Sequence, residues 1–164
     1  MTIKYNNVFI EDAYTICGNY ENDGPLSKYF DKKYEKDLYF GEKSWEQAEV
    51  HLLKEANTNI LKKNKLKEED IDLLISGDLQ NQIAASNYMA REFNIPFLGI
   101  FEACSTSGEG LAIGSTYIEG GFAKKILVST SSHNMAAEKQ FRNPTEYGTP
   151  KPKTATFTST GGVS

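Results

Sequence analysis

Apolar residues recur at helical spacing from residue 44 onward, where the first long element is predicted. Residues 44–47 read Ser-Trp-Glu-Gln, a capping box that marks the start of a helix. The apolar positions that follow are three or four residues apart: Trp45, Ala48, Leu52, Ala56 and Ile60. This spacing predicts an amphipathic helix that runs to about residue 63 and packs one apolar face against a core.

Short apolar runs alternate with helical stretches in the rest of the chain. The runs at 71–75, 96–101 and 126–128 have the length and composition of buried strands, and the stretches 83–93 and 107–120 have helical composition. Strands that alternate with helices pair in parallel through right-handed crossovers. The pattern therefore predicts an α/β fold with a mostly parallel central sheet covered on both faces.

The two ends of the chain are less regular. We expect a short strand at 7–10, and a covering loop or short helix at 28–37. Residues 154–158 alternate Thr with Ala or Phe, as a strand would, and run into Gly-Gly-Val-Ser at 161–164. We interpret this C-terminus as a cut inside a larger fold, with a frayed tail as the alternative.

Composition narrows the classes of function. The chain has 164 residues and a net charge of −4, with 18 Lys and Arg against 22 Asp and Glu, which argues against a nucleic-acid binder. No apolar run is long enough for a membrane span, and no secretory signal is visible. Two cysteines and two histidines without ligand spacing argue against a structural metal, and we expect the thiols to be reduced.

One cysteine stands at a chemically favourable position. Cys104 lies between the predicted strand 96–101 and a helix with small residues at 108, 110, 112 and 114. Ligands bind at the carboxyl ends of parallel strands, and a helix N-terminus stabilises a thiolate or a bound carboxylate. A slim helix of this kind suits burial between layers. An inert buried thiol is the alternative for Cys104, and Cys17 is expected to be structural.

Two more polar loops are expected at the same edge of the sheet. Residues 129–134, which end in His133 and Asn134, follow one predicted strand, and residues 78–82 follow another. Three polar loops that converge at one edge predict a pocket.

The segment 103–106, Ala-Cys-Ser-Thr, opens a glycine-rich helix after an apolar strand and is similar to the N-terminal half of the thiolase fold. The resemblance implies that Cys104 occupies the position of the nucleophile in thiolases and ketoacyl synthases. It also implies that residues 1–164 form one thiolase-like domain, with a buried glycine-rich helix, of a protein about twice as long. Such a half would expose apolar surface where the other half packs.

A finer resemblance extends along nearly the whole chain. The sequence resembles the stage V sporulation protein AD family in six ordered blocks: Gly-Pro-Leu at 24–26, Trp-Glu-Gln-Ala-Glu at 45–49, Gly-Asp-Leu-Gln-Asn-Gln at 77–82, Ala-Cys-Ser-Thr-Ser at 103–107, Ser-Ser-His-Asn at 131–134, and Glu-Lys-Gln-Phe-Arg-Asn-Pro-Thr-Glu-Tyr-Gly at 138–148. One departure is Glu102, where the family commonly has Gly. A carboxylate there would oppose both a thiolate and an anionic ligand.

The family resemblance implies a function. It implies binding of dipicolinic acid, alone or as its calcium chelate, and uptake of that ligand into the developing spore together with other proteins of the same operon. It also implies a homodimer formed through the strand 96–101, no cofactor, and a peripheral place on the cytoplasmic side of the forespore inner membrane. The expected ligand-binding residues are Cys104, Ser105, Thr106, His133, Asn134 and Arg142, with Lys139 as a further source of positive charge.

Two alternatives stay open. The first is a thiolase- or ketoacyl-synthase-like acyltransferase that uses Cys104 as its nucleophile and acyl-CoA as its substrate. The second is a thiolase-like scaffold with a vestigial pocket and a role in protein contact.

Overall fold

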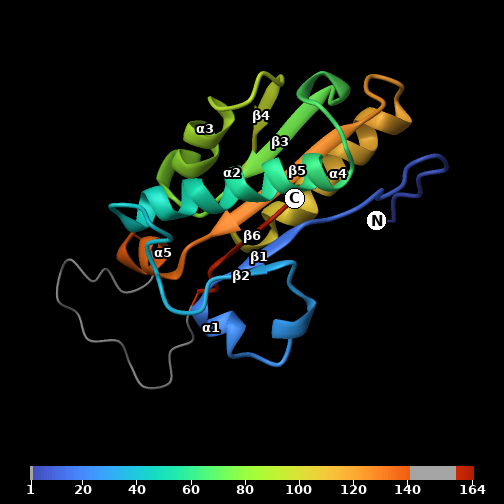
Figure 1. The fold of residues 1–164 in the computed structure, drawn as a ribbon. Coiled ribbons are helices and arrows are strands. Elements are labelled where there is room, and N and C mark those ends of the chain that lie inside the picture. The colour runs from blue at the N-terminus through green and yellow to red at the C-terminus, as the bar shows by residue number, and fades with distance from the viewer. Residues whose placement is uncertain (1, 141–157) are drawn as a thin grey trace.

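The fold is taken from a computed structural model, and the description covers residues 2–140 and 158–164 (Figure 1). Six strands form one sheet in the order β2-β1-β6-β5-β3-β4. The strands are β1 (Thr15–Cys17), β2 (Lys32–Lys33), β3 (Leu73–Gly77), β4 (Phe97–Gly99), β5 (Ile126–Ser132) and β6 (Gly161–Val163). The helices are α1 (Asn19–Asn22), α2 (Trp45–Lys63), α3 (Ala84–Ala90), α4 (Thr106–Glu119) and α5 (Asn134–Gln140).

The sheet is mixed but mostly parallel. Strand β3 pairs in parallel with β4 on one side and β5 on the other, and β1 pairs in parallel with β2. Strand β6 lies between β5 and β1 and runs antiparallel to both. The predicted α/β class with a mostly parallel central sheet is confirmed, and the antiparallel β6 is an addition that the sequence did not indicate.

Helix α2 begins where the sequence predicts. The Ser44 hydroxyl accepts a hydrogen bond from the Gln47 backbone N–H at 3.2 Å. The Gln47 side chain accepts from the N–H of Lys43 at 3.3 Å, one residue before the cap. This cap fixes the start of a helix whose apolar face is buried, and α2 and α3 together cover one face of the sheet (Figure 1).

Helix α4 covers the other face through its glycines. Gly110 and Gly114 are buried, and a Cβ atom at Gly110 would lie 2.7 Å from Val128 of β5. The predicted slim helix is therefore confirmed on its sheet side. The side of α4 away from the sheet is exposed among the described residues, as at Leu111 and Tyr117, so the burial of this helix between two layers stays a prediction.

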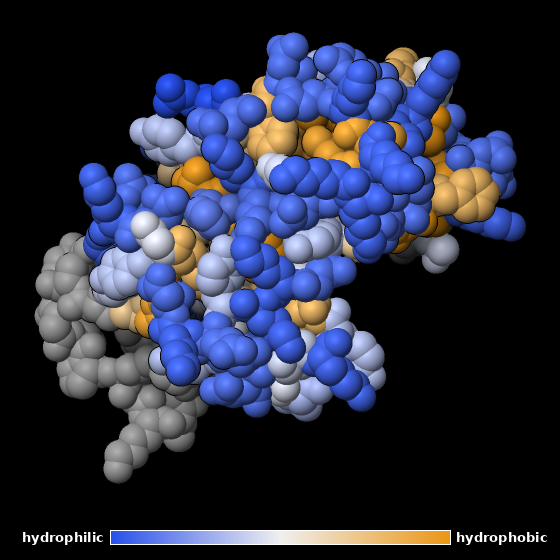
Figure 2. All heavy atoms as spheres, in the orientation of Figure 1, coloured by the Kyte–Doolittle hydropathy of each residue, from blue (hydrophilic) through white to orange (hydrophobic). Residues whose placement is uncertain are grey.

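Several large apolar side chains are exposed, as expected for a domain that packs against a further layer. They include Phe9, Ile10, Phe101, Leu111 and Phe122. In the view of Figure 2 most of the surface is hydrophilic, and hydrophobic atoms gather in the upper part, over the region of β3, β5 and α4 in Figure 1.

The structure also corrects the expectations for the N-terminal segment. Residues 7–10 form no strand, because the Asn7 N–H and its neighbour Asn6 bond to the Glu119 carboxylate of α4 instead of to another strand. Residues 28–37 contain part of the short 3₁₀ turn Ser27–Tyr29, followed by strand β2, rather than only a covering loop or helix. Of the strand expected at 154–158, residues 154–157 lie outside the described residues.

Two glycines of α4 offer a matched test of the contact with the sheet. We expect Gly110→Ala to lower the free energy of unfolding by about 1–3 kcal/mol, because its methyl group would overpack the contact with Val128. Gly108→Ala should raise it by about 1 kcal/mol, because no atom lies within 4 Å of that Cβ position and alanine favours a helix. Urea unfolding of both variants measures the difference. Equal effects of the same sign would contradict the close packing of α4.

Candidate functional site

The junction between β4 and α4 holds Cys104 in a tight, self-bonded turn. The Thr106 hydroxyl donates to the Ala103 carbonyl at 2.8 Å and accepts from the Glu102 N–H at 3.1 Å. The Ser105 N–H donates to the Glu102 carbonyl at 2.9 Å, and the Ser105 hydroxyl reaches the same oxygen at 3.0 Å. Ala103 has a φ of +46°, in the left-handed region. The Thr106 and Ser105 side chains are therefore hydrogen-bonded within the turn, whereas Cys104 is exposed to solvent.

Gly77 at the end of β3 lets this junction approach the sheet. A Cβ atom at Gly77 would lie 2.3 Å from the Ile100 carbonyl oxygen and 2.5 Å from the Thr106 methyl group. Only glycine leaves room for that contact. The position of the Cys104 turn therefore depends on a missing side chain on the neighbouring strand.

The two cysteines lie in opposite surroundings. Cys104 is exposed and Cys17 is buried in β1, and both are free thiols. Burial, and secondly the Glu21 carboxylate, raise the pKa of Cys17. Cys17 is therefore the structural thiol, as expected, and Cys104 is open to solvent rather than the inert buried thiol of the alternative.

His133 lies in the core rather than at the edge of an open pocket. Its Nε2–H donates to the Leu38 carbonyl at 2.8 Å, its Nδ1 accepts from the Ala136 N–H at 3.4 Å, and its ring meets Phe40 edge-on at 5.7 Å. Desolvation lowers the pKa of this fully buried imidazole, which keeps it neutral. Both ring nitrogens are thus committed to backbone groups.

Asn134 is also buried, at the start of α5. Its N–H donates to the Thr160 hydroxyl, which in turn donates to the Asn134 side-chain oxygen, both at 2.9 Å. The Asn134 Nδ2 atom has no hydrogen-bond partner within the described ranges. Asn134 therefore connects the end of β5 to Thr160, the residue that precedes β6.

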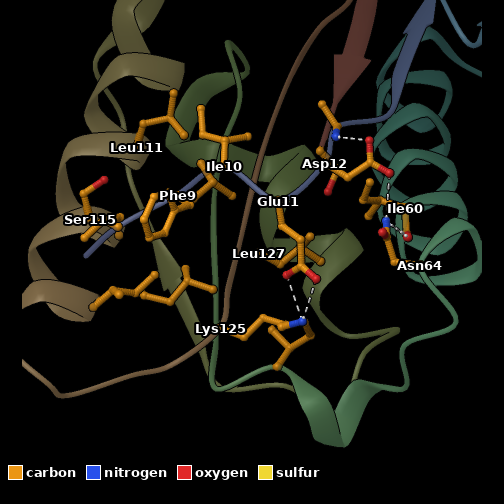
Figure 3. Close-up of a pocket in the computed structure, with 18 of the residues that line it drawn as sticks. Phe9, Ile10, Glu11, Asp12, Ile60, Asn64, Leu111, Ser115, Lys125 and Leu127 are labelled. Atoms are coloured by element: carbon orange, nitrogen blue, oxygen red, sulfur yellow. Dashed lines mark hydrogen bonds and ion pairs between the residues drawn. The ribbon is translucent and has the colours of Figure 1, made fainter. Parts of the chain in front are cut away.

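The structure does not bring Cys104 and His133 onto neighbouring strands. Strand β3 lies between β4 and β5, so the two loops leave strands about 10 Å apart, at roughly 4.8 Å per strand. The cavity between α2, α4 and the N-terminal segment (Figure 3) is lined by neither of them, nor by Ser105, Thr106 or Asn134. Arg142 lies outside the described residues.

The polar loop after β3 and the end of β5 do converge, through a residue of α2. The Glu49 carboxyl accepts from the Gln80 side-chain amide at 2.9 Å and from the Ser131 hydroxyl at 3.0 Å. Asp78 accepts from the backbone N–H groups of Gln80 at 2.8 Å and Ser86 at 2.7 Å. Four elements of the fold therefore meet in one buried polar cluster, which we call the Glu49 cluster.

The Glu49 cluster holds two carboxyl groups away from water. Glu49 and Asp78 are 0% and 1% exposed. Desolvation, and secondly the nearby Asp78, raise the pKa of Glu49 to about 8, and desolvation also raises the pKa of Asp78. At neutral pH Glu49 is therefore mainly protonated.

Glu49 was missed at the sequence level, although a signal was present. It stands four residues after Trp45 and three before Leu52, on the apolar face of the predicted helix. A carboxylate in an apolar face is rarely buried without polar partners, so this position predicts a polar layer beneath the helix.

The described part of the chain offers no obvious metal site or membrane span. No group of three or more His, Cys, Asp or Glu side chains there is placed to hold a metal ion. No helix among those residues is long and apolar enough to cross a bilayer.

Comparison with solved structures defines the fold class. The chain matches 3-oxoacyl-[acyl-carrier-protein] synthase III from Aquifex aeolicus with a TM-score of 0.57 and 16% identity, over 92% of this chain and 50% of that one. It matches PksG, an HMG-CoA synthase from Bacillus subtilis, with a TM-score of 0.54 and 17% identity, over 94% and 38%. The fold is therefore thiolase-like, as the Cys104 junction predicted.

Sequence comparison then identifies the family. All of residues 1–164 match the family model described as stage V sporulation protein AD (SpoVAD). The Stage V sporulation protein AD of Bacillus subtilis (strain 168) is 53% identical over 154 residues, which are 94% of this chain and 45% of that protein. The chain belongs to the stage V sporulation protein AD family, and it spans less than half the length of this curated relative.

The Glu49 cluster predicts a specific dependence of stability on pH. A carboxyl whose pKa rises from about 4.5 to about 8 on folding stabilises the protein below pH 4.5, and this contribution is lost as the pH rises toward 8. Glu49→Gln stays uncharged, so its stability relative to the parent should rise over this window, by roughly a few kcal/mol at about 1.4 kcal/mol per pKa unit.

Urea unfolding at several pH values measures this difference, with Glu46→Gln as the control on the same helix. The Lys139 ammonium 3.0 Å away helps to lower the pKa of Glu46, so the control should lose stability relative to the parent as the pH rises through the acid range. A pH-independent difference between Glu49→Gln and the parent would show that Glu49 is ionised in the folded protein.

Proposed function

We propose that this protein binds dipicolinic acid and takes part in its uptake into the developing spore. The match of the whole chain to a sporulation family carries the proposal. Dipicolinate is a flat aromatic dianion, so its site needs hydrogen-bond donors that favour negative charge.

The start of α4 supplies such donors. The helix has 14 residues, and no side chain caps its first turn. The Thr106 N–H already donates to the Ala103 carbonyl, so the donors we propose are the N–H groups that follow it in the first turn. Cys104 and Ser105 are exposed beside it. We place the ligand against this first turn, with Cys104, Ser105 and Thr106 in contact. His133 and Asn134 act by holding the loop after β5, and Arg142 is a candidate counter-charge.

The remaining parts of the proposal concern the setting of the protein. We infer that it works with other proteins of the same sporulation operon, from a peripheral position on the cytoplasmic side of the forespore inner membrane. Binding of dipicolinate as its calcium chelate would reduce the charge that the site has to neutralise.

An acyltransferase is the second candidate. The exposed Cys104 at the start of α4, in the fold of a 3-oxoacyl synthase, favours it. His133 supplies no base to that thiol, because both of its ring nitrogens are hydrogen-bonded to backbone groups in the core. We therefore rank ligand binding first.

Calorimetry on the full-length protein separates the two functions. We expect dipicolinate to bind and acetyl-CoA to leave no signal. Cys104→Trp should abolish dipicolinate binding by steric exclusion, whereas Cys104→Ala should retain it within about tenfold, because the thiol lines the site without reacting. Cys17→Ala is the control for thiol loss elsewhere. Unchanged binding in Cys104→Trp would place the site away from α4, and acetyl-CoA turnover that Cys104→Ala abolishes would establish the enzyme.

We also propose a homodimer formed through β4. This strand lies at the end of the sheet, so its outer edge has no neighbour among the described strands, and the exposed Phe101 follows it. Phe101→Arg should convert a dimer into a monomer in sedimentation analysis, whereas Phe122→Arg, at an exposed apolar residue away from β4, should leave the dimer intact. A monomeric parent protein, or equal effects of both changes, would contradict this interface.

A further inference from the structure

Four titratable side chains form a hydrogen-bonded network with His51 beside α2. The Nδ1 atom of His51 lies 3.1 Å from the Glu42 carboxylate, and its Nε2 atom lies 3.1 Å from the Tyr34 hydroxyl. That hydroxyl also donates to the Glu55 carboxylate at 2.7 Å, and Lys32 forms an ion pair with the same carboxylate. The network therefore connects β2 and the segment after it to α2.

The network is complete only when both nitrogens of the His51 ring carry a proton. Tyr34 has a single proton, and the 2.7 Å contact with the Glu55 carboxylate uses it. Desolvation, and secondly the hydrogen bond to Glu55, raise the pKa of Tyr34, so the hydroxyl keeps this proton. The Tyr34 oxygen and the Glu42 carboxylate can then only accept from His51. A neutral imidazole has one N–H for these two acceptors, and a protonated imidazole has two.

The charges around the ring also favour its protonated form. With His51 protonated, the two positive charges of His51 and Lys32 match the carboxylates of Glu42 and Glu55. Loss of the proton leaves these four groups with one negative charge in excess. The His51 side chain is 33% exposed, so the ring exchanges its proton directly with solvent. Histidine side chains change charge between about pH 5 and pH 8.

The two acceptors of His51 lie at the two ends of the segment 34–42, which we call the strap. The strap leads from β2 to the start of α2 (Figure 1). Its Leu38 carbonyl accepts from Nε2 of His133 at 2.8 Å, and the ring of Phe40 meets the His133 ring edge-on at 5.7 Å. The strap therefore closes over His133, just before α5 begins.

The tip of the strap is under backbone strain. Phe40 has a φ of +51°, in the left-handed region that a phenylalanine rarely adopts. Its ring is 5% exposed and belongs to the apolar cluster that includes Ala48 and Leu52 of α2. Burial of the ring and strain of the backbone oppose each other, so the closed strap has a reduced net stability to which the His51 contacts add.

We propose that the strap is a pH-dependent cover, which is closed over His133 when His51 is protonated and opens when His51 loses its proton. A neutral His51 ring can hold only one end of the strap, at Tyr34 or at Glu42. Opening releases Nε2 of His133 from the Leu38 carbonyl and exposes the ring to solvent. The device depends on the fold alone and goes beyond the ligand binding proposed above.

Hydrogen exchange of the full-length protein, measured by mass spectrometry on peptides that span 34–42, reports on the strap. We expect its protection factor, which is corrected for the intrinsic exchange rate, to fall at least about fivefold from pH 5.5 to pH 8. His51→Gln should give low protection at both pH values, and Glu42→Gln should reduce the change with pH. Glu92→Gln, at an exposed carboxylate paired with Lys54 at 2.9 Å, is the matched control and should behave like the parent.

Nitrogen NMR of the histidine-labelled protein measures the ring itself, and at pH 5.5 both ring nitrogens of His51 should be protonated. A neutral His51 ring at that pH, with the strap protected, would overturn the proposal. So would equal protection at the two pH values, or a pH dependence that His51→Gln retains in full, since Glu49 also titrates toward pH 8 and is unchanged in that variant. Dipicolinate is absent from these measurements, so their outcome is independent of the proposed function.

Discussion

The close contact between glycine residues and neighbouring backbone is the constraint on which the candidate site depends. At Gly77 the end of β3 lies so near the Ile100 carbonyl that a single methyl group would not fit, and Gly110 brings α4 close to the Val128 side chain of β5. These contacts determine how closely the start of α4 approaches the sheet. They thereby place the Cys104 turn beside the carboxyl end of the sheet, with its thiol exposed.

Buried polar groups organise the part of this sheet edge that lies at the end of β5. Glu49 connects α2 to the loop after β3 and to the end of β5. His133 is held by backbone groups of Leu38 and Ala136, and Asn134 by the Thr160 hydroxyl, at the start of α5. Buried polar groups are tolerated when they are hydrogen-bonded, and they then specify one arrangement of the elements around them. The polar residues after β5 therefore form a rigid support rather than the wall of an open cleft.

Much of this architecture could be predicted from the sequence, because it depends on local patterns. The capping box at Ser44, the apolar spacing of α2 and the glycines of α4 each specify a local element with one buried face. The thiolase-like class followed from the residues around Cys104. These signals come from residues that are close in the sequence, so they can be recognised without knowledge of tertiary contacts.

The arrangement across the sheet could not be predicted in the same way. Local patterns gave no sign that β3 separates β4 from β5, which keeps Cys104 and His133 on strands that are not neighbours. Strand β6 is Gly-Gly-Val, a sequence with little strand propensity, and its pairing with β1 and β5 determines its conformation. Glu49 was missed because its partners, in the loop after β3 and in β5, are about 30 and 80 residues away in the sequence.

The central claim is that the exposed first turn of α4 beside Cys104 is a ligand site. A crystal structure of the full-length protein with dipicolinate bound tests it most directly. The account predicts a ligand carboxylate within hydrogen-bond distance of the first N–H groups of α4, with the pyridine ring against the Cys104 side chain and no covalent bond. Ligand density elsewhere, with the first turn of α4 covered by protein, would contradict it.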